Sequence, residues 1–158
     1  MESNVLRDPE VAMDRTDLAL LRALEKDARK SFRDLAKETH VSISTVSSRI
    51  KKLRDEGIVR GYTVVLDPRA VGYDLTVVIG VRIAKGKLLE VQRRISVFES
   101  VFGVYDVTGD WDSLVLARFR TRHDLDKFVK QILALEHVER TYTHLVLNTV
   151  KEEVRVPV

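Results

Sequence analysis

Hydroxyl-bearing and basic side chains run together along residues 42–54, in the stretch SISTVSSRIKKLR. This stretch holds four basic residues and no acidic one. Short hydroxyls can approach base edges and phosphates, and Lys and Arg neutralise phosphate charge, so a helix with such a face suits the DNA major groove. The alternative is a solvated basic helix that binds nothing. We predict DNA contacts from one set of residues: Arg33, Ser42, Ser44, Thr45, Ser47, Ser48, Arg49, Lys51, Lys52 and Arg54.

Residues 31–57 predict the element that carries this face, two short helices joined by a tight turn. The helical spacing breaks at Thr39-His40-Val41, Ser42 then suits an N-cap, and Gly57 can end the second helix in the left-handed conformation. Apolar residues recur at helical spacing on what we expect to be the buried side: Phe32, Leu35 and Ala36 in the first helix, and Ile43, Val46, Ile50 and Leu53 in the second.

An earlier helix is expected to complete a three-helix core. Asp14 suits its N-cap, with Asp17 near the positive helix end. The helix is expected to end near residues 28–30, with a core-facing stripe of Leu20, Leu21, Leu24 and Ala28. After Gly57, residues 58–68 are rich in β-branched and aromatic residues and predict an extended strand, the wing of a winged helix, with Gly61 at a turn or kink.

The second half of the chain predicts strands and helices in the order βαββαβ. The expected strands are residues 75–84, 101–109, 113–120 and 137–150, and the expected helices are 87–98 and 121–135, the latter capped by Thr121. This order is the ferredoxin-like arrangement, a four-stranded antiparallel sheet with both helices on one face. The fold class is therefore α+β.

The two faces of this sheet differ in composition. In the first strand Val77, Ile79 and their alternate neighbours form one apolar face, while Thr76, Val78, Gly80 and Arg82 form the other. One face must meet the helices, and the opposite face is half apolar and open in a monomer. We expect a second subunit to cover it; the alternative is cover by the linker or by the N-terminal domain.

Composition bounds the class of protein. The chain has 158 residues, 44% hydrophobic and 32% charged, with a net charge of +3. That charge is modest, so nucleic-acid binding must come from a local patch. The absence of cysteine excludes disulfides and thiolate chemistry. The sequence shows no signal peptide and no long apolar run, so we expect a cytoplasmic protein with no membrane partner.

A second candidate site is the turn Gly109-Asp110-Trp111-Asp112. Two carboxylates beside backbone N–H groups could hold the ammonium and carboxylate of an amino acid. The alternative is an Asp-rich hairpin turn that needs no ligand. The four histidines are scattered without metal-site spacing. The cations of residues 119–122 could meet an effector or DNA, with a solvated loop as the alternative.

Two stretches resemble the Lrp/AsnC family of feast/famine transcriptional regulators. They are DLALLRALEKDARKSFRDLAKETHVSISTVSSRIKKLRDEGIVRGY and VYDVTGDWDSLVLARF, within a resemblance that covers about residues 14–150. The resemblance implies dimers that bind DNA through residues 42–55, pair sheet to sheet, exchange hinge-strand contacts and often assemble into tetramers or octamers. It also implies an amino-acid effector site between subunits, formed by Gly103, Val104, Tyr105, Gly109, Asp110, Trp111, Asp112, Thr141 and Thr143.

We therefore expect a tail at 1–13, a winged helix–turn–helix domain at 14–66, a linker at 67–74, a ferredoxin-like effector-binding and oligomerisation domain at 75–150, and a tail at 151–158. The leading hypothesis is a sequence-specific DNA-binding regulator modulated by an amino acid or related metabolite, with no required cofactor and no metal. One alternative is an oligomeric metabolite-sensing module without DNA binding. A second is a ferredoxin-like enzyme with Asp110, Asp112 and His123 around a metal, although no catalytic arrangement is evident.

Overall fold

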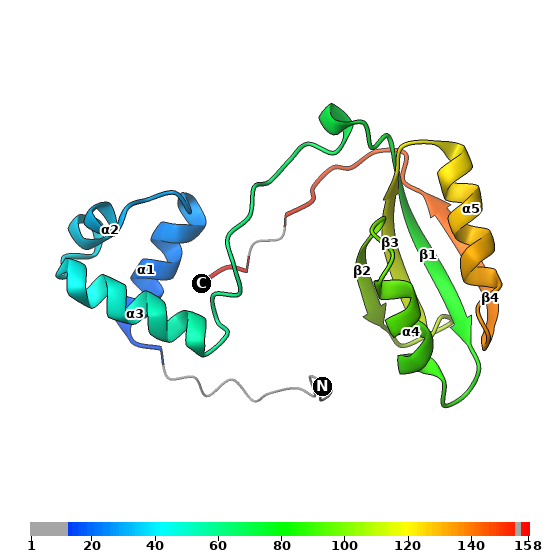
Figure 1. Ribbon diagram of the computed structural model, residues 1–158, viewed down its shortest axis with the longest axis horizontal. Coiled ribbons are helices and arrows are strands. Elements are labelled where there is room, and N and C mark those ends of the chain that lie inside the picture. The colour runs from blue at the N-terminus through cyan, green and yellow to red at the C-terminus, as the bar shows by residue number, and fades with distance from the viewer. Residues whose placement is uncertain (1–12, 154–155) are drawn as a thin grey trace. The chain divides into compact units, whose positions relative to one another are not determined.

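The structure, a computed structural model, describes residues 13–153 and 156–158 (Figure 1). The tail expected at 1–13 lies outside these residues except for Met13, as do positions 154–155 of the expected C-terminal tail. The chain divides into two compact units. The N-terminal unit reaches Val64 and takes in the chain from Glu153 onward, and the C-terminal unit spans Val65–Glu152.

Three helices form the N-terminal unit: α1 (Arg15–Lys26), α2 (Phe32–Thr39) and α3 (Ile43–Asp55). Each begins at a side-chain cap, and the caps are Asp14, Ser31 and Ser42. The turn between α2 and α3 is made by His40, whose φ of 54° is left-handed. The helices bury a common core, which consists of Leu20, Ala23, Leu24, Leu35, Ala36, Val46 and Ile50 with Val41 against it.

The prediction of burial is wrong for three apolar residues of this unit. Phe32 and Ile43 are 42% and 49% exposed because each is the first residue of its helix, one turn before that helix meets the core. Ala28 is exposed because α1 ends at Lys26, with Asp27 as its C-cap, before the predicted end near 28–30. A helical period shows which face is apolar but does not show where along the helix the neighbouring helix begins.

The strand predicted for residues 58–68 is absent from this chain. Gly57 takes a φ of 72° as expected of a helix stop, and the chain then runs on without strand pairing through residues 58–66. Val64 and Val65 are 76% and 94% exposed. A strand requires hydrogen bonds to a neighbouring strand, and no described segment of the chain pairs with this one. Residues 69–71 form a short 3₁₀ turn (η1, Arg69–Val71) instead of an irregular linker throughout.

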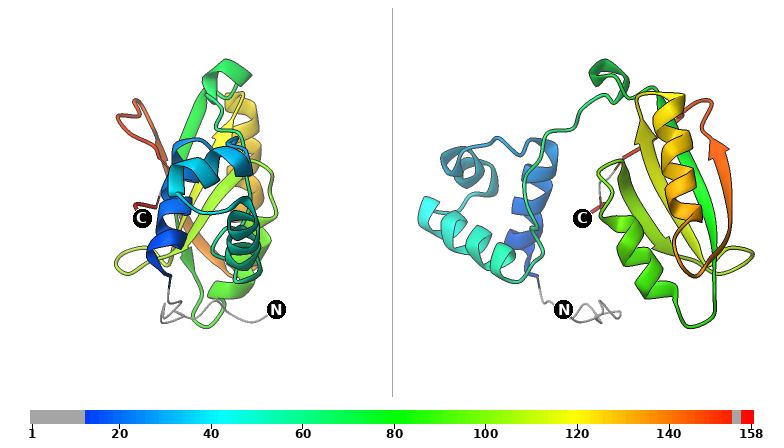
Figure 2. Two further views of the ribbon diagram at one scale, coloured as in Figure 1. Left: turned by 90° about the vertical axis from the view of Figure 1, so that its left-hand side faces the viewer. Right: turned by 45° about the vertical axis from the view of Figure 1, so that its right-hand side comes forward.

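The C-terminal unit has the predicted ferredoxin-like order. Its elements are β1 (Leu75–Ile83), α4 (Leu88–Ser96), β2 (Val101–Asp106), β3 (Ser113–Phe119), α5 (Arg122–Leu133) and β4 (Val138–Leu145). The sheet order is β2-β3-β1-β4 with antiparallel pairing throughout. Helices α4 and α5 cover the same face of the sheet (Figure 2). On the helix-facing side of β1, Val77, Ile79, Val81 and Ile83 are buried, as the alternation predicted. Gly80, on the opposite face, is buried as well.

Two strands end several residues before their predicted ends. β4 ends at Leu145 instead of reaching residue 150, because its partner β1 begins at Leu75 and the last bond runs from the Val146 N–H to the Thr76 carbonyl at 2.9 Å. β2 ends at Asp106 instead of 109, because its partner β3 begins at Ser113 and the residues between form the hairpin turn. Within the described residues, no helix is long and apolar enough to cross a membrane.

Candidate nucleic-acid interface and effector site

Helix α3 carries the predicted DNA-contacting face because one narrow stripe holds it to the core. Val46, Ile50 and Leu53 are 0–4% exposed and face α1 and α2. The side of α3 away from them is open to solvent. It presents six of the predicted contact residues, all of them exposed: Ser44, Ser47, Ser48, Lys51, Lys52 and Arg54.

The hydroxyls at the start of α3 form a hydrogen-bonded cluster. The Ser42 hydroxyl accepts the Thr45 N–H at 3.0 Å and lies 2.8 Å from both the Ser44 and Thr45 hydroxyls. The Ser48 hydroxyl donates to the Thr45 carbonyl at 3.0 Å. These contacts cap the helix and leave short polar groups at its solvent-exposed N-terminal turn, where they can approach an edge of DNA.

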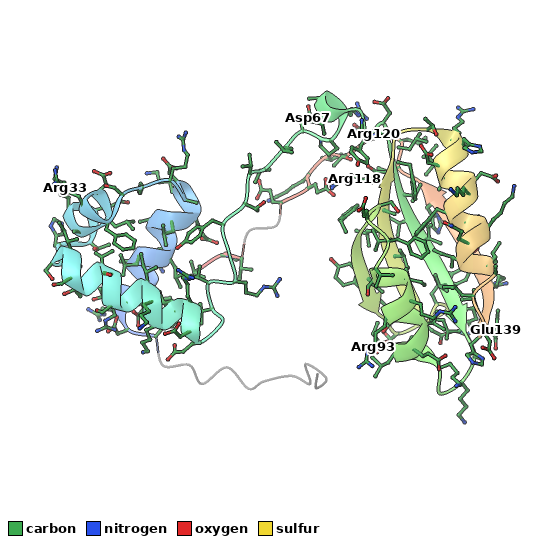
Figure 3. All side chains as sticks on the ribbon, in the orientation of Figure 1. Arg33, Asp67, Arg93, Arg118, Arg120 and Glu139 are labelled. Carbon is green, nitrogen blue, oxygen red and sulfur yellow. The ribbon has the colours of Figure 1, made fainter. Side chains whose placement is uncertain are left out.

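The basic residues of α3 differ in what they contact. Lys52 lies 3.9 Å from Glu56, a weak surface pairing. Arg54 lines a shallow hollow with Phe32 and Tyr62. Arg33, the predicted contact outside α3, is exposed on α2 (Figure 3).

Arg49 stands apart from the other predicted contacts. Its side chain is only 33% exposed, and its Nη1 lies 2.5 Å from the Asp14 carboxylate and 3.2 Å from the Asp17 carboxylate. The Asp17 N–H and the Arg49 guanidinium both lower the pKa of the Asp14 carboxyl below its ordinary value. The guanidinium of Arg49 therefore points to the start of α1 and not into the exposed face.

The residues implied in an effector site divide between the two faces of the sheet. Gly103 and Tyr105 pair with Leu116 and Leu114 of β3 on the open face. Val104 pairs with Val115, which faces the helices. Thr141 and Thr143 pair with Val81 and Ile79 of β1, so they also lie on the helix side. Within one chain these residues do not converge.

One of the two carboxylates of the predicted turn, that of Asp112, is already bound within the fold. Asp112 accepts the Ile83 N–H at 2.8 Å and lies 3.6 Å from Arg82, so it already fixes the turn to β1. The Asp110 backbone carbonyl accepts a bond from Arg82 at 3.0 Å. Gly109 takes a φ of 111°, which a residue with a side chain rarely adopts. The alternative of a self-sufficient Asp-rich turn accounts for these contacts.

Trp111 lies over the open face of β1. A Cβ at Gly80 would stand 2.5 Å from the indole ring, so the missing side chain of Gly80 makes room for it. Tyr142 packs beside the indole at 6.1 Å between ring centroids, and the Arg140 guanidinium lies 4.9 Å from the ring. Gly80, Arg82 and Arg140 were missing from the predicted site. The sequence could have indicated them, because the period-two alternation of the strands places them on the open face.

Of the two cations predicted within residues 119–122, Arg120 has structural partners, and Arg122 is exposed at the first position of α5. Arg118 pairs with Glu152 at 2.6 Å, and Arg120 donates to the Val71 carbonyl at 2.8 Å while stacking over Tyr73 at 4.5 Å (Figure 3). Residues 13–153 and 156–158 contain no cluster of three His, Cys, Asp or Glu side chains able to hold a metal.

Two family models together match most of the chain. A winged helix–turn–helix DNA-binding model covers residues 13–60, and the Lrp/AsnC ligand-binding domain model covers residues 76–156. The chain belongs to the Lrp/AsnC family. The predicted resemblance and the predicted α+β fold class are thereby confirmed.

Two sequence relatives of this chain are transcriptional regulators of Pyrococcus species. This Lrp/AsnC protein is 44% identical to the uncharacterised HTH-type transcriptional regulator PH1692 of Pyrococcus horikoshii, over 91% of this chain and 97% of the relative. It is 34% identical to the HTH-type transcriptional regulator FL11 of Pyrococcus abyssi, over 94% of this chain and 98% of that protein.

Solved structures agree with the architecture of this Lrp/AsnC chain. The transcriptional regulator NMB0573 of Neisseria meningitidis, in complex with L-Met, matches with a TM-score of 0.83 and 28% identity over 92% of this chain and 96% of that one. AsnC of Escherichia coli has the same fold, with a TM-score of 0.83 and 24% identity over 90% of this chain and 97% of that one.

Proposed function

We propose that this chain is a sequence-specific DNA-binding transcriptional regulator that reads the major groove with α3. The observation that carries the proposal is the exposed face of α3, where hydroxyls cluster at the first turn and cations follow along the helix. Membership of the Lrp/AsnC family and the regulator relatives support it. The proposed contacts are Arg33, Ser42, Ser44, Thr45, Ser47, Ser48, Lys51, Lys52 and Arg54. Arg49 is left out of this set because its guanidinium pairs with Asp14 and Asp17.

Selection from a pool of random-sequence duplexes tests this function. The full chain should enrich one sequence, and the logarithm of its binding constant for that duplex should fall linearly with the logarithm of salt concentration as bound counterions are released. Lys51→Gln should reduce the slope by about one, because it removes one cation from a phosphate. Lys127→Gln, which removes the same charge from the exposed side of α5, is the matched control and should leave the slope unchanged.

Recovery of no enriched sequence at low salt would refute sequence-specific binding and favour the metabolite-sensing alternative. An enriched sequence whose affinity is as sensitive to Lys127→Gln as to Lys51→Gln would refute α3 as the reading element.

The protein acts as a homo-oligomer in this proposal. The open face of the sheet carries Val78, Leu114 and Leu116, beside Tyr105 at 54% exposure and Tyr142 at 56%. Such a half-apolar face is typical of a surface that a second subunit covers. Sedimentation at graded concentrations should give a mass of at least two 18.1-kDa protomers, and Leu116→Lys, at the centre of the face, should shift it toward one.

We further infer that an amino acid modulates DNA binding through the C-terminal unit. The ligand-binding family model and the L-Met complex of the Neisseria regulator support this inference. Because the effector residues of one chain lie on both sheet faces, a site that uses them all draws on more than one subunit. Calorimetric titration with the common amino acids, L-Met first, should give heat for at least one. Asp110→Ala should weaken the binding of that amino acid. The absence of binding heat for every amino acid tested would refute the inference.

A further inference from the structure

Asp17 has a buried carboxylate within the N-terminal unit. It is 1% exposed, although it lies in the first turn of a surface helix. A buried charge is costly unless it is paired and hydrogen-bonded. The Asp17 carboxylate accepts a hydrogen bond from the Asp14 N–H at 3.3 Å, through the capping box of α1. Its two oxygens also accept hydrogen bonds from Nη1 of Arg49, at 3.2 and 3.3 Å. Among the described residues, Arg49 is the cation that pairs with it.

Arg49 reaches these carboxylates from the side of α3. It lies three residues after Val46 and four before Leu53, both 0% exposed, so it borders the buried stripe. Its Nη1 joins the Asp14 carboxylate, 2.5 Å away, to the Asp17 carboxylate. The three side chains, here named the α1–α3 clasp, tie the first turn of α1 to the middle of α3.

The clasp constrains the rotation of α3 about its axis, which the apolar stripe alone does not do. Apolar packing is non-directional, so three aliphatic side chains leave α3 some freedom to rotate about its axis. A guanidinium holds carboxylates through a planar set of donors with fixed geometry. A rotation of about 20° at a helix radius of about 5–6 Å moves the outer side chains by about 2 Å. That displacement breaks hydrogen bonds to base edges, which tolerate only a few tenths of an ångström.

We propose that Arg49 is a positioning residue that fixes the rotation of α3, and that it does not itself contact DNA. The proposal rests on the proposed function of α3 as the DNA-reading element. It differs from that function by assigning one of the basic residues of α3 to a contact within the protein instead of a contact with DNA. It also assigns Asp14 and Asp17 a part in recognition, although both carry the charge that DNA repels.

The salt dependence separates a positioning residue from a phosphate contact. The probes are the duplex enriched from the random pool and a random-sequence duplex of the same length. Lys51→Gln should weaken binding to both duplexes alike and lower the salt slope by about one. Arg49→Gln should leave the slope unchanged and lower the ratio of specific to non-specific affinity by about tenfold or more, which is the range expected for one mismatched base pair.

Asp14→Asn provides a test in which charge and position act in opposite directions. Asn is as good an N-cap as Asp, so α1 keeps its cap, while the carboxylate nearest Arg49 is lost. The variant carries one fewer negative charge, so electrostatics alone predicts tighter binding to both duplexes. The clasp predicts a lower ratio of specific to non-specific affinity. Arg49→Lys, which keeps the charge without the planar donors, should recover only part of the wild-type ratio.

The proposal is overturned if Asp14→Asn raises the ratio or leaves it unchanged, or if Arg49→Gln lowers the salt slope as Lys51→Gln does. Far-UV circular dichroism at the binding temperature confirms that each variant is folded, and if Arg49→Gln does not fold, Asp14→Asn decides. Failure of the proposed function looks different, because the wild-type chain then enriches no duplex at all.

Discussion

Replacing Gly80 by alanine should force Trp111 away from the open face of the sheet. The added Cβ would lie 2.5 Å from Cδ2 of the indole and 2.7 Å from Cε2. Carbon atoms pack at about 3.5–4.0 Å, so the ring must withdraw by about 1 Å. Withdrawal also disturbs the packing of the indole with Tyr142 and Arg140.

The expected cost follows from two opposed effects. Overpacking of this kind costs about 1–3 kcal/mol. Alanine in a strand is favoured over glycine by about 0.5–1 kcal/mol, because glycine loses more backbone entropy on folding. Gly80→Ala should therefore lower the free energy of unfolding of the C-terminal unit by about 1–2 kcal/mol.

Urea unfolding of the full chain at fixed concentration measures this cost. The emission of Trp111, the one tryptophan in the sequence, reports the transition of the C-terminal unit. Gly61→Ala is the control, since Gly61 has open space around it and no positive φ. That substitution should change stability by less than about 0.5 kcal/mol.

A double-mutant cycle isolates the clash from the general effect of the substitution. In a Trp111→Ala background, followed by circular dichroism, Gly80→Ala should be neutral or stabilising by up to about 1 kcal/mol. The coupling energy between the two sites should then be about 2 kcal/mol. Equal costs of Gly80→Ala in both backgrounds would refute the reasoning, because the cost would not come from the indole.

Three further predictions concern the helices. Ser42→Ala removes the cap of α3 and should lower the stability of the N-terminal unit by about 1 kcal/mol in thermal unfolding. Leu35→Ala, at a position 0% exposed in the same core, should cost about 2–5 kcal/mol. The Ser31 hydroxyl and N–H lower the pKa of Asp34, so Asp34 stabilises the fold above the unfolded pKa near 3.9 and loses this contribution as pH falls through the folded value. Acid titration of Asp34→Asn should accordingly show a shallower loss of stability below about pH 4, and an unchanged titration would contradict that assignment.

The sequence was sufficient for the parts of the fold that local rules determine. Asp14, Ser42 and Thr121 were recognisable as N-caps because a short polar side chain preceded a helical apolar period in each case. The alternation of β1 identified its buried face because a strand has a period of two. The order of strands and helices then left few topologies to choose from.

Features that depend on distant partners could not be predicted in this way. Residues 58–66 have strand-like composition, but a strand forms only where another strand lies alongside. Arg49 and Lys51 carry the same charge on the same helix, so the sequence does not distinguish them. Only the fold shows that the buried carboxylate of Asp17, 32 residues earlier in the chain, pairs with Arg49. The effector residues came from a family resemblance, which did not take account of the strand pleat that separates Val104 from its neighbours Gly103 and Tyr105.

The extended segment at residues 58–66 has a practical consequence for handling the protein. Its backbone is without strand pairing in the described chain, and its side chains at Val64, Val65 and Leu66 are 61–94% exposed. Exposed extended backbone is what proteases bind and cut. A single nick there would cut the covalent connection between α3 and β1 while sparing both cores. The rate of cleavage therefore reports whether residues 58–66 are paired with another strand, and its measurement needs no added label.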